Sequence, residues 1–109
     1  QPPNVQEAGP VDAWVTGYYC LHDGGPVGDG GGFCGATASG HILSPSDSGL
    51  VAACGYAWRL GAILRVEGYG DVVCLDRGNL SPRQIDIFYY TSSELWAGPQ
   101  GLRRVEEVR

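Results

Sequence analysis

The sequence predicts an all-β protein, a small closed barrel of about six short strands with one short helix late in the chain. The chain has 109 residues, among them 18 glycines and 7 prolines, a composition that favours short strands and turns over long helices. Short runs rich in valine, isoleucine and tyrosine alternate with turn-forming residues. Closing such strands into a barrel leaves no exposed sheet edge. This length suits one domain with a modest core.

The chain is predicted to begin with a tail, a strand and a long loop. Residues 1–12 are polar and contain three prolines, so we expect a flexible tail, followed by a single barrel domain over residues 13–109. The stretch "DAWVTGYYC" (12–20) has the aromatic and β-branched composition of a strand. Residues 21–35 are too rich in glycine for a regular element, and residues 36–49 are dominated by turn formers.

The remaining elements follow at short intervals. A "GYG" turn separates two of the strand-like runs and predicts a hairpin. The stretch "TSSELWAGPQG" (91–101) opens with a threonine and has a glutamate three residues later, which predicts a short capped helix ended by Gly98-Pro99. The expected strands cover residues 50–54, 62–67, 71–75, 83–90 and 102–108.

Four cysteines, an even number in a short chain, predict two disulfides and an oxidising compartment. Three pairings are possible. We favour Cys20–Cys34, which closes the glycine-rich loop, and Cys54–Cys74, which joins two strand-like runs. The spacings are wide and contain no C-x-x-C pair, so neither a zinc site nor another cofactor is expected.

The charge balance narrows the choice of partner. The formal net charge is −5 and every basic residue is an arginine, which argues against a nucleic-acid partner. The sequence contains no apolar run long enough to span a membrane and no signal-peptide pattern, so we expect no membrane insertion. The expectation is a monomer that is secreted or located in the cell envelope.

Several short motifs occur in one order: "TASG" (37–40), "RLGAILRVEGYG" (59–70), "LDRG" (75–78) and "IDIF" (85–88). Together with "SSELWAG" they resemble the three-aspartate (3D) domain of bacterial cell-wall lytic transglycosylases, over roughly residues 13–108. The resemblance implies a six-stranded double-psi β-barrel, a plan shared with rare lipoprotein A, the expansins and the family 45 endoglucanases. It also implies action on peptidoglycan glycan strands or another polysaccharide.

The chain departs from that family pattern. The first of the three aspartates is missing, and its place falls near Cys54. Arg59 stands where the family has proline, and Asn79 replaces the second glycine of the family loop. A disulfide at Cys54 could take over a structural role of the missing aspartate. If that aspartate is instead catalytic, the chain is a non-catalytic polysaccharide-binding module.

Asp86 is the expected catalytic acid. Cleaving a glycosidic bond needs a carboxylic acid that protonates the leaving oxygen, and burial raises the pKa of such a group. Asp86 lies between Ile85 and Ile87. Asp76 would add a second negative charge nearby, or act as the base of an inverting hydrolase. Without the resemblance, Asp86 is equally an aspartate on the outer face of a half-buried strand, and Asp76 a turn residue.

A glycan-binding cleft would use aromatic faces, hydroxyls and a guanidinium group. Each candidate residue for such a cleft also has a plainer structural interpretation, as a turn former, a core aromatic or an ion-pair partner of Asp76. Trp14 is likewise interpreted as a core aromatic. The expected substrate-binding residues are Thr37, Ser39, Tyr18, Tyr56, Trp58, Tyr69 and Arg77. The sequence thus predicts a peptidoglycan lytic transglycosylase, with a binding module and a β-glucan hydrolase as alternatives.

Overall fold

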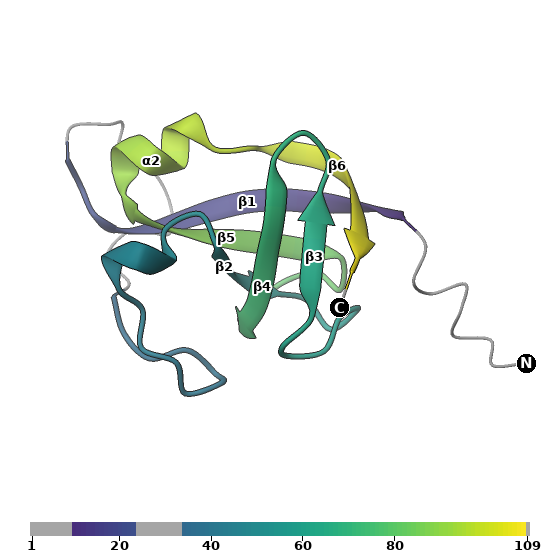
Figure 1. Cartoon of the computed structure of the whole chain (residues 1–109), viewed down its shortest axis with the longest axis horizontal. Coiled ribbons are helices and arrows are strands. Elements are labelled where there is room, and N and C mark those ends of the chain that lie inside the picture. Colours follow the sequence, from purple (N-terminus) through teal and green to yellow (C-terminus); the bar gives the residue numbers. More distant parts are fainter. Residues whose placement is uncertain (1–9, 24–33, 109) are drawn as a thin grey trace, which may run out of the picture.

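The computed structural model describes residues 10–23 and 34–108, and they form a closed six-stranded barrel (Figure 1). The order around the barrel is β1-β5-β2-β4-β3-β6. The described residues also contain a single 3-10 turn, η1 (Pro45–Asp47), and a single short α-helix, α2 (Ser92–Ala97). The strands are β1 (Val11–Leu21), β2 (Val51–Cys54), β3 (Ile63–Val66), β4 (Gly70–Asp76), β5 (Gln84–Thr91) and β6 (Gly101–Glu107). The predicted all-β barrel with one short helix is confirmed.

The observed strands lie within two residues of the predicted ranges. Residues 1–9 of the predicted tail and residues 24–33 of the glycine-rich loop lie outside the described residues. The predicted tail ends too late, because Val11 and Asp12 already belong to β1 and pair with Val105 and Arg104 of β6. Backbone pairing with β6 therefore extends β1 further toward the N-terminus than its composition indicated.

Two parallel pairs lie next to each other in the barrel. β1 runs parallel to β5, and β2 runs parallel to β4, whereas the other four neighbouring pairs are antiparallel. Figure 1 shows β1 crossing the whole molecule with β5 alongside it, and β3 and β4 as a hairpin in front. The hairpin turn at "GYG" is confirmed, since Val66 pairs with Gly70.

The barrel wall is apolar on both faces over part of its surface. Side chains that point inward, among them Val15, Ile85 and Ile87, form the main core. Alternate residues point outward, and a second cluster forms there around Phe88. Leu43 belongs to this outer cluster, so the segment before β2 covers the wall from outside. A polar side chain on this outer face is therefore partly shielded from water.

Both predicted disulfides are confirmed. Cys20 and Cys34 are joined with their Cα atoms 4.9 Å apart, and Cys54 and Cys74 with their Cα atoms 5.6 Å apart. The second bond links β2 to β4 inside the main core, where neither cysteine is exposed. Two disulfides are typical of proteins that fold in an oxidising compartment.

The predicted helix cap is also confirmed. The Thr91 side chain accepts a hydrogen bond from the Glu94 backbone N–H, and the Glu94 carboxylate accepts one from the Thr91 N–H. The helix ends at Gly98, as expected. Among the residues that the model describes, no helix has the length and apolarity needed to cross a membrane.

Candidate active site on the outer wall of the barrel

A row of four residues crosses four neighbouring strands and brings the two predicted carboxylates together. Thr16 of β1 is in register with Asp86 of β5, Asp86 with Ala53 of β2, and Ala53 with Asp76 of β4. Residues in register project from the same face of a sheet. Ala53 belongs to the outer apolar cluster, so the row lies on the outside of the barrel.

A β-bulge gives Asp76 its place in this row. Ala52 pairs with Cys74, but the next residue, Ala53, pairs with Asp76, so Leu75 is an extra residue on β4. Cys74 points into the main core, and strict alternation would turn Asp76 inward as well. The extra residue shifts the alternation and turns Asp76 outward, a role that bulges often have near functional sites.

Asp86 has the environment expected of a catalytic acid. The side chain is half-buried beside the outer apolar cluster, and burial raises the pKa of its carboxyl group. The Thr16 hydroxyl donates a hydrogen bond of 2.8 Å to Asp86 Oδ1, which lowers the pKa, and the charge of Asp76 raises it. The net effect is a raised pKa, so the neutral form of the carboxyl group persists to higher pH than in a free aspartate.

A hydrogen-bonded chain orients Thr16 toward Asp86. The Gln84 Nε2 group donates to Thr16 Oγ1 over 3.2 Å, while Gln84 Oε1 accepts from the Ser81 backbone N–H over 3.2 Å. The bond from Ser81 fixes the orientation of the Gln84 amide. Because this amide donates to Thr16 Oγ1, the Thr16 hydroxyl hydrogen is available for Asp86. Sequence reasoning missed Gln84 and Thr16. The alternation of Gln84 with Asp86 on one strand was the available signal, but their partner on β1 depends on a register set by the fold.

Asp76 anchors the turn that covers the outer face. Its Oδ1 accepts hydrogen bonds from the backbone N–H groups of Ala38 and Arg77, both 2.8 Å. The hydroxyls of Thr37 and Ser39 are 2.9 Å apart, and Thr37 donates to the His41 carbonyl. In this turn the backbone contacts Asp76, whereas the two hydroxyls stabilise the turn itself.

Tyr18 belongs to the outer cluster and lies near the two carboxylates. It is buried on the same face of β1 as Thr16, and its ring packs against Phe88 with centroids 5.5 Å apart. Burial raises the pKa of the phenol, and the charges of Asp76 and Asp86 raise it further. The phenol therefore remains neutral at physiological pH, close enough to both aspartates to feel their charges.

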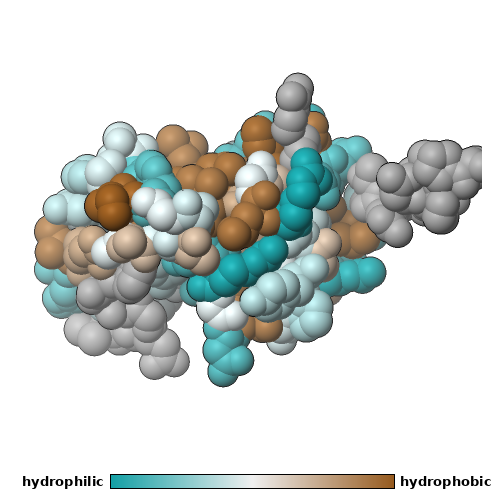
Figure 2. Space-filling model, turned by 90° about the horizontal axis from the view of Figure 1, so that it is seen from below, coloured by the Kyte–Doolittle hydropathy of each residue, from teal (hydrophilic) through white to brown (hydrophobic). Residues whose placement is uncertain are grey.

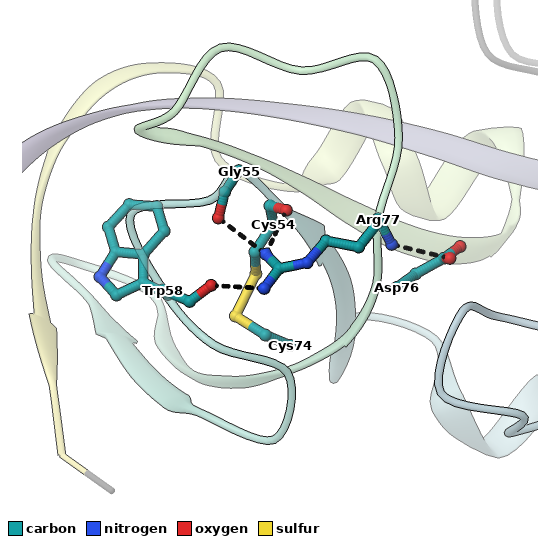
Figure 3. The surroundings of a disulfide bond; sticks show 6 residues. All are labelled: Cys54, Gly55, Trp58, Cys74, Asp76 and Arg77. Atoms are coloured by element: carbon teal, nitrogen blue, oxygen red, sulfur yellow. Dashed lines mark hydrogen bonds between the residues drawn. A yellow bond between two sulfur atoms is a disulfide. The ribbon is translucent and has the colours of Figure 1, made fainter.

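Arg77 holds the loop after β2 (Figure 3). Its guanidinium donates to the carbonyl oxygens of Cys54 and Gly55, each over 2.9 Å, and to that of Trp58 over 2.7 Å. It also lies over the Tyr56 ring, 4.5 Å from the centroid. In this structure Arg77 therefore acts as a clamp on the loop.

The predicted aromatic residues fall in different places. Trp58 belongs to the main core, and Tyr69 lies at the opposite end of β4 from Asp76, where its hydroxyl donates to the Gly49 carbonyl. Tyr56 is 77% exposed on the loop held by Arg77. Trp14, which the sequence left as a core residue, is 54% exposed on the face of β1 that carries Thr16. Of the predicted aromatics, Tyr18 lies on the same face of β1 as Thr16, and the charges of both carboxylates raise its pKa.

Cys54 points into the main core and is bonded to Cys74. Within the described ranges, 10–23 and 34–108, no three or more histidine, cysteine or acidic side chains gather as a metal site would require. In comparisons with models of known families, with curated proteins and with solved structures, the chain matches none.

Proposed function

We propose that this protein cleaves the glycan strands of peptidoglycan as a lytic transglycosylase, with Asp86 as general acid and base. The observation that carries the proposal is the half-buried Asp86 carboxyl group, whose pKa is raised by burial and by the charge of Asp76. Such a group donates a proton near neutral pH better than a free aspartate does. The order of the motifs and the two adjacent parallel strand pairs in a six-stranded closed barrel support a relation to the double-psi β-barrels.

A lytic transglycosylase requires a single acid. Asp86 protonates the glycosidic oxygen, and the bond from C1 of the muramic sugar to that oxygen breaks. The 6-hydroxyl of the same sugar attacks C1 and forms an anhydro ring, and the Asp86 carboxylate accepts the hydroxyl proton. The carboxyl group is thereby restored, and no water is consumed.

The contacts of Asp76 support a single-acid mechanism. Asp76 and Asp86 are two strands apart, with Ala53 between them. That arrangement separates their backbones by roughly 10 Å, which disfavours the roughly 5 Å carboxyl spacing of a retaining glycosidase and is compatible with the roughly 6.5–9.5 Å of an inverting hydrolase. Asp76 Oδ1 is engaged by two backbone N–H groups, so this carboxylate holds the turn and supplies charge.

A non-catalytic binding module is the second candidate function. It is favoured by two observations. The first of the three aspartates expected from the resemblance is missing, with Cys54 near its place, and the aromatic rings of Trp14 and Tyr56 are exposed. In either case the two disulfides support a place outside the cytoplasm, secreted or in the envelope.

Digestion of purified sacculi tests the proposed reaction directly. We expect the protein to release soluble muropeptides that end in anhydro-muramic acid, identified by mass spectrometry. Release of fragments with reducing ends would instead indicate a hydrolase with Asp76 as its base. Sedimentation of the protein with the sacculi without any released fragment would leave the binding module as the function.

Two variants should shift the pH profile of activity in opposite directions. Thr16→Val removes the hydrogen bond that lowers the pKa of Asp86, so the alkaline limb of the activity profile should move to higher pH. Asp76→Asn removes the charge that raises this pKa, so the limb should move to lower pH. Asparagine keeps an oxygen for the Ala38 and Arg77 N–H groups. Initial rates over a range of pH measure both shifts, and two shifts in one direction would contradict the assignment of Asp86 as the acid.

A further inference from the structure

Two large apolar side chains lie next to each other on the outer face of β1 and β6. Trp14 is 54% exposed and its register partner Leu102 is 63% exposed. The face of the molecule seen in Figure 2 carries apolar side chains that lie among polar ones. An exposed tryptophan paired with an exposed leucine is costly in water, because both present apolar area to the solvent. We call this pair the Trp14–Leu102 platform.

The platform adjoins the row that contains Asp86. Trp14 precedes Thr16 by two residues on β1, and its partner Gln84 precedes Asp86 by two residues on β5. Residues two apart on a strand share a face and lie roughly 7 Å apart. A ligand that covers the Trp14 ring is therefore continuous with one that reaches the Asp86 carboxyl group.

Polar groups border the platform on two sides, one along the strands and one across them. Asp12 and Arg104 form an ion pair of 3.3 Å in the row before it, and the Gln84 amide lies in the same row as Trp14. Gln84 Nε2 carries two hydrogens and uses one of them for Thr16. A flat aromatic ring with hydrogen-bonding groups at its border suits a pyranose, which has an apolar face and polar edges.

We propose that the Trp14–Leu102 platform is a sugar-binding subsite beside Asp86 that selects N-acetylated sugars. The Trp14 ring stacks on the apolar face of a pyranose, and Leu102 contacts the methyl of its N-acetyl group. Glucose has only a hydroxyl at that position and gains no such contact. The inference rests on the proposed function and names its substrate class, N-acetylated glycans as opposed to β-glucans.

The test measures binding in the Asp86→Asn variant, so that turnover does not consume the ligand. Two soluble oligosaccharides with the same length and linkage are compared by calorimetry, one of N-acetylglucosamine and one of glucose. We expect the N-acetylated oligomer to bind about tenfold more tightly, the size expected for one small apolar group in a pocket. Trp14→Ala should abolish binding of both, and Leu102→Ala should remove the preference only.

Trp96→Ala is the matched control, because Trp96 is 49% exposed but belongs to α2. Its affinities should equal those of the parent. Equal affinity for the two oligomers, unchanged binding in Trp14→Ala, or no binding of either oligomer would overturn the subsite. Selective binding that depends on Trp14, with no release of fragments from sacculi by the wild type, would keep the subsite and reject the catalytic function. Release of fragments unaffected by Trp14→Ala would do the reverse.

Discussion

Asp86→Asn should lower the release of muropeptides by about 10²–10⁴-fold, the usual contribution of a general acid. Asparagine has nearly the shape of aspartate, and its oxygen can still accept the Thr16 hydrogen bond. It cannot, however, donate an acidic proton to the glycosidic oxygen. The measurement is the rate of anhydro-muropeptide release at the pH optimum of the wild type. A rate within threefold or so of the wild type would remove Asp86 from the mechanism.

Asp71→Asn is a matched control, because it makes the same chemical change at an exposed aspartate. Asp71 lies on β4, as Asp76 does, but is exposed and pairs with Arg65 over 3.0 Å. The same chemical change there removes a surface ion pair, which is worth at most about 1 kcal/mol. We expect activity to be unchanged in this variant.

Stability separates loss of chemistry from loss of fold in Asp86→Asn. The pKa of Asp86 is raised in the folded state, so folding favours the neutral carboxyl group. This stabilisation is complete below the pKa of an unfolded aspartate and is lost as pH rises through the folded pKa. At neutral pH the asparagine variant should therefore melt at a higher temperature than the wild type, and this difference should shrink in acid. A variant that loses activity while it gains stability is folded.

Replacing Cys54 and Cys74 together by alanine should cost about 3 kcal/mol or more in the free energy of unfolding. A crosslink across a loop of this order is worth roughly 3 kcal/mol, and the two cysteines are 20 apart in sequence. Both are also fully buried, so the alanines leave space in the core. Denaturant unfolding under non-oxidising and non-reducing conditions measures the difference.

The other disulfide is the comparison for this variant. Cys20–Cys34 closes a segment of similar length, with a sequence separation of 14, but Cys34 is exposed. Its double alanine variant loses the crosslink with less loss of packing, and should be destabilised less. Arg77 should increase this difference in stability between the two variants. Its guanidinium donates a hydrogen bond to the Cys54 carbonyl, so its position depends on the backbone at the buried disulfide. Equal destabilisation of the two variants would show that the core position of Cys54–Cys74 contributes nothing beyond the crosslink.

Local sequence patterns predicted most of the fold. Alternation predicts Ile85 and Ile87 in the core with Asp86 on the opposite face. The glycine-rich loop and the two strand-like runs favoured the disulfide pairing that is observed. The same alternation was available around Trp14, whose neighbours Ala13 and Val15 are buried, and it would have placed the indole outside.

What the sequence could not supply depends on register between distant strands. The Thr16–Asp86 hydrogen bond joins residues 70 apart, and no local signal sets that pairing. Arg77 was expected to bind ligand because guanidinium groups suit carboxylates. Its partners proved to be carbonyl groups of a loop 19 to 23 residues earlier, whose path is fixed only when the barrel closes.

The extra residue at Leu75 has a consequence for how this chain can change. Successive residues of a regular strand face opposite sides, so Cys74 and Asp76 can face opposite sides either as direct neighbours or with one bulged residue between them. Deleting Leu75 would make the two residues direct neighbours in a regular ladder, with Cys74 still in the core and Asp76 still facing outward. The deletion would instead remove the local bend that the bulge introduces and the contact of Leu75 with the outer cluster.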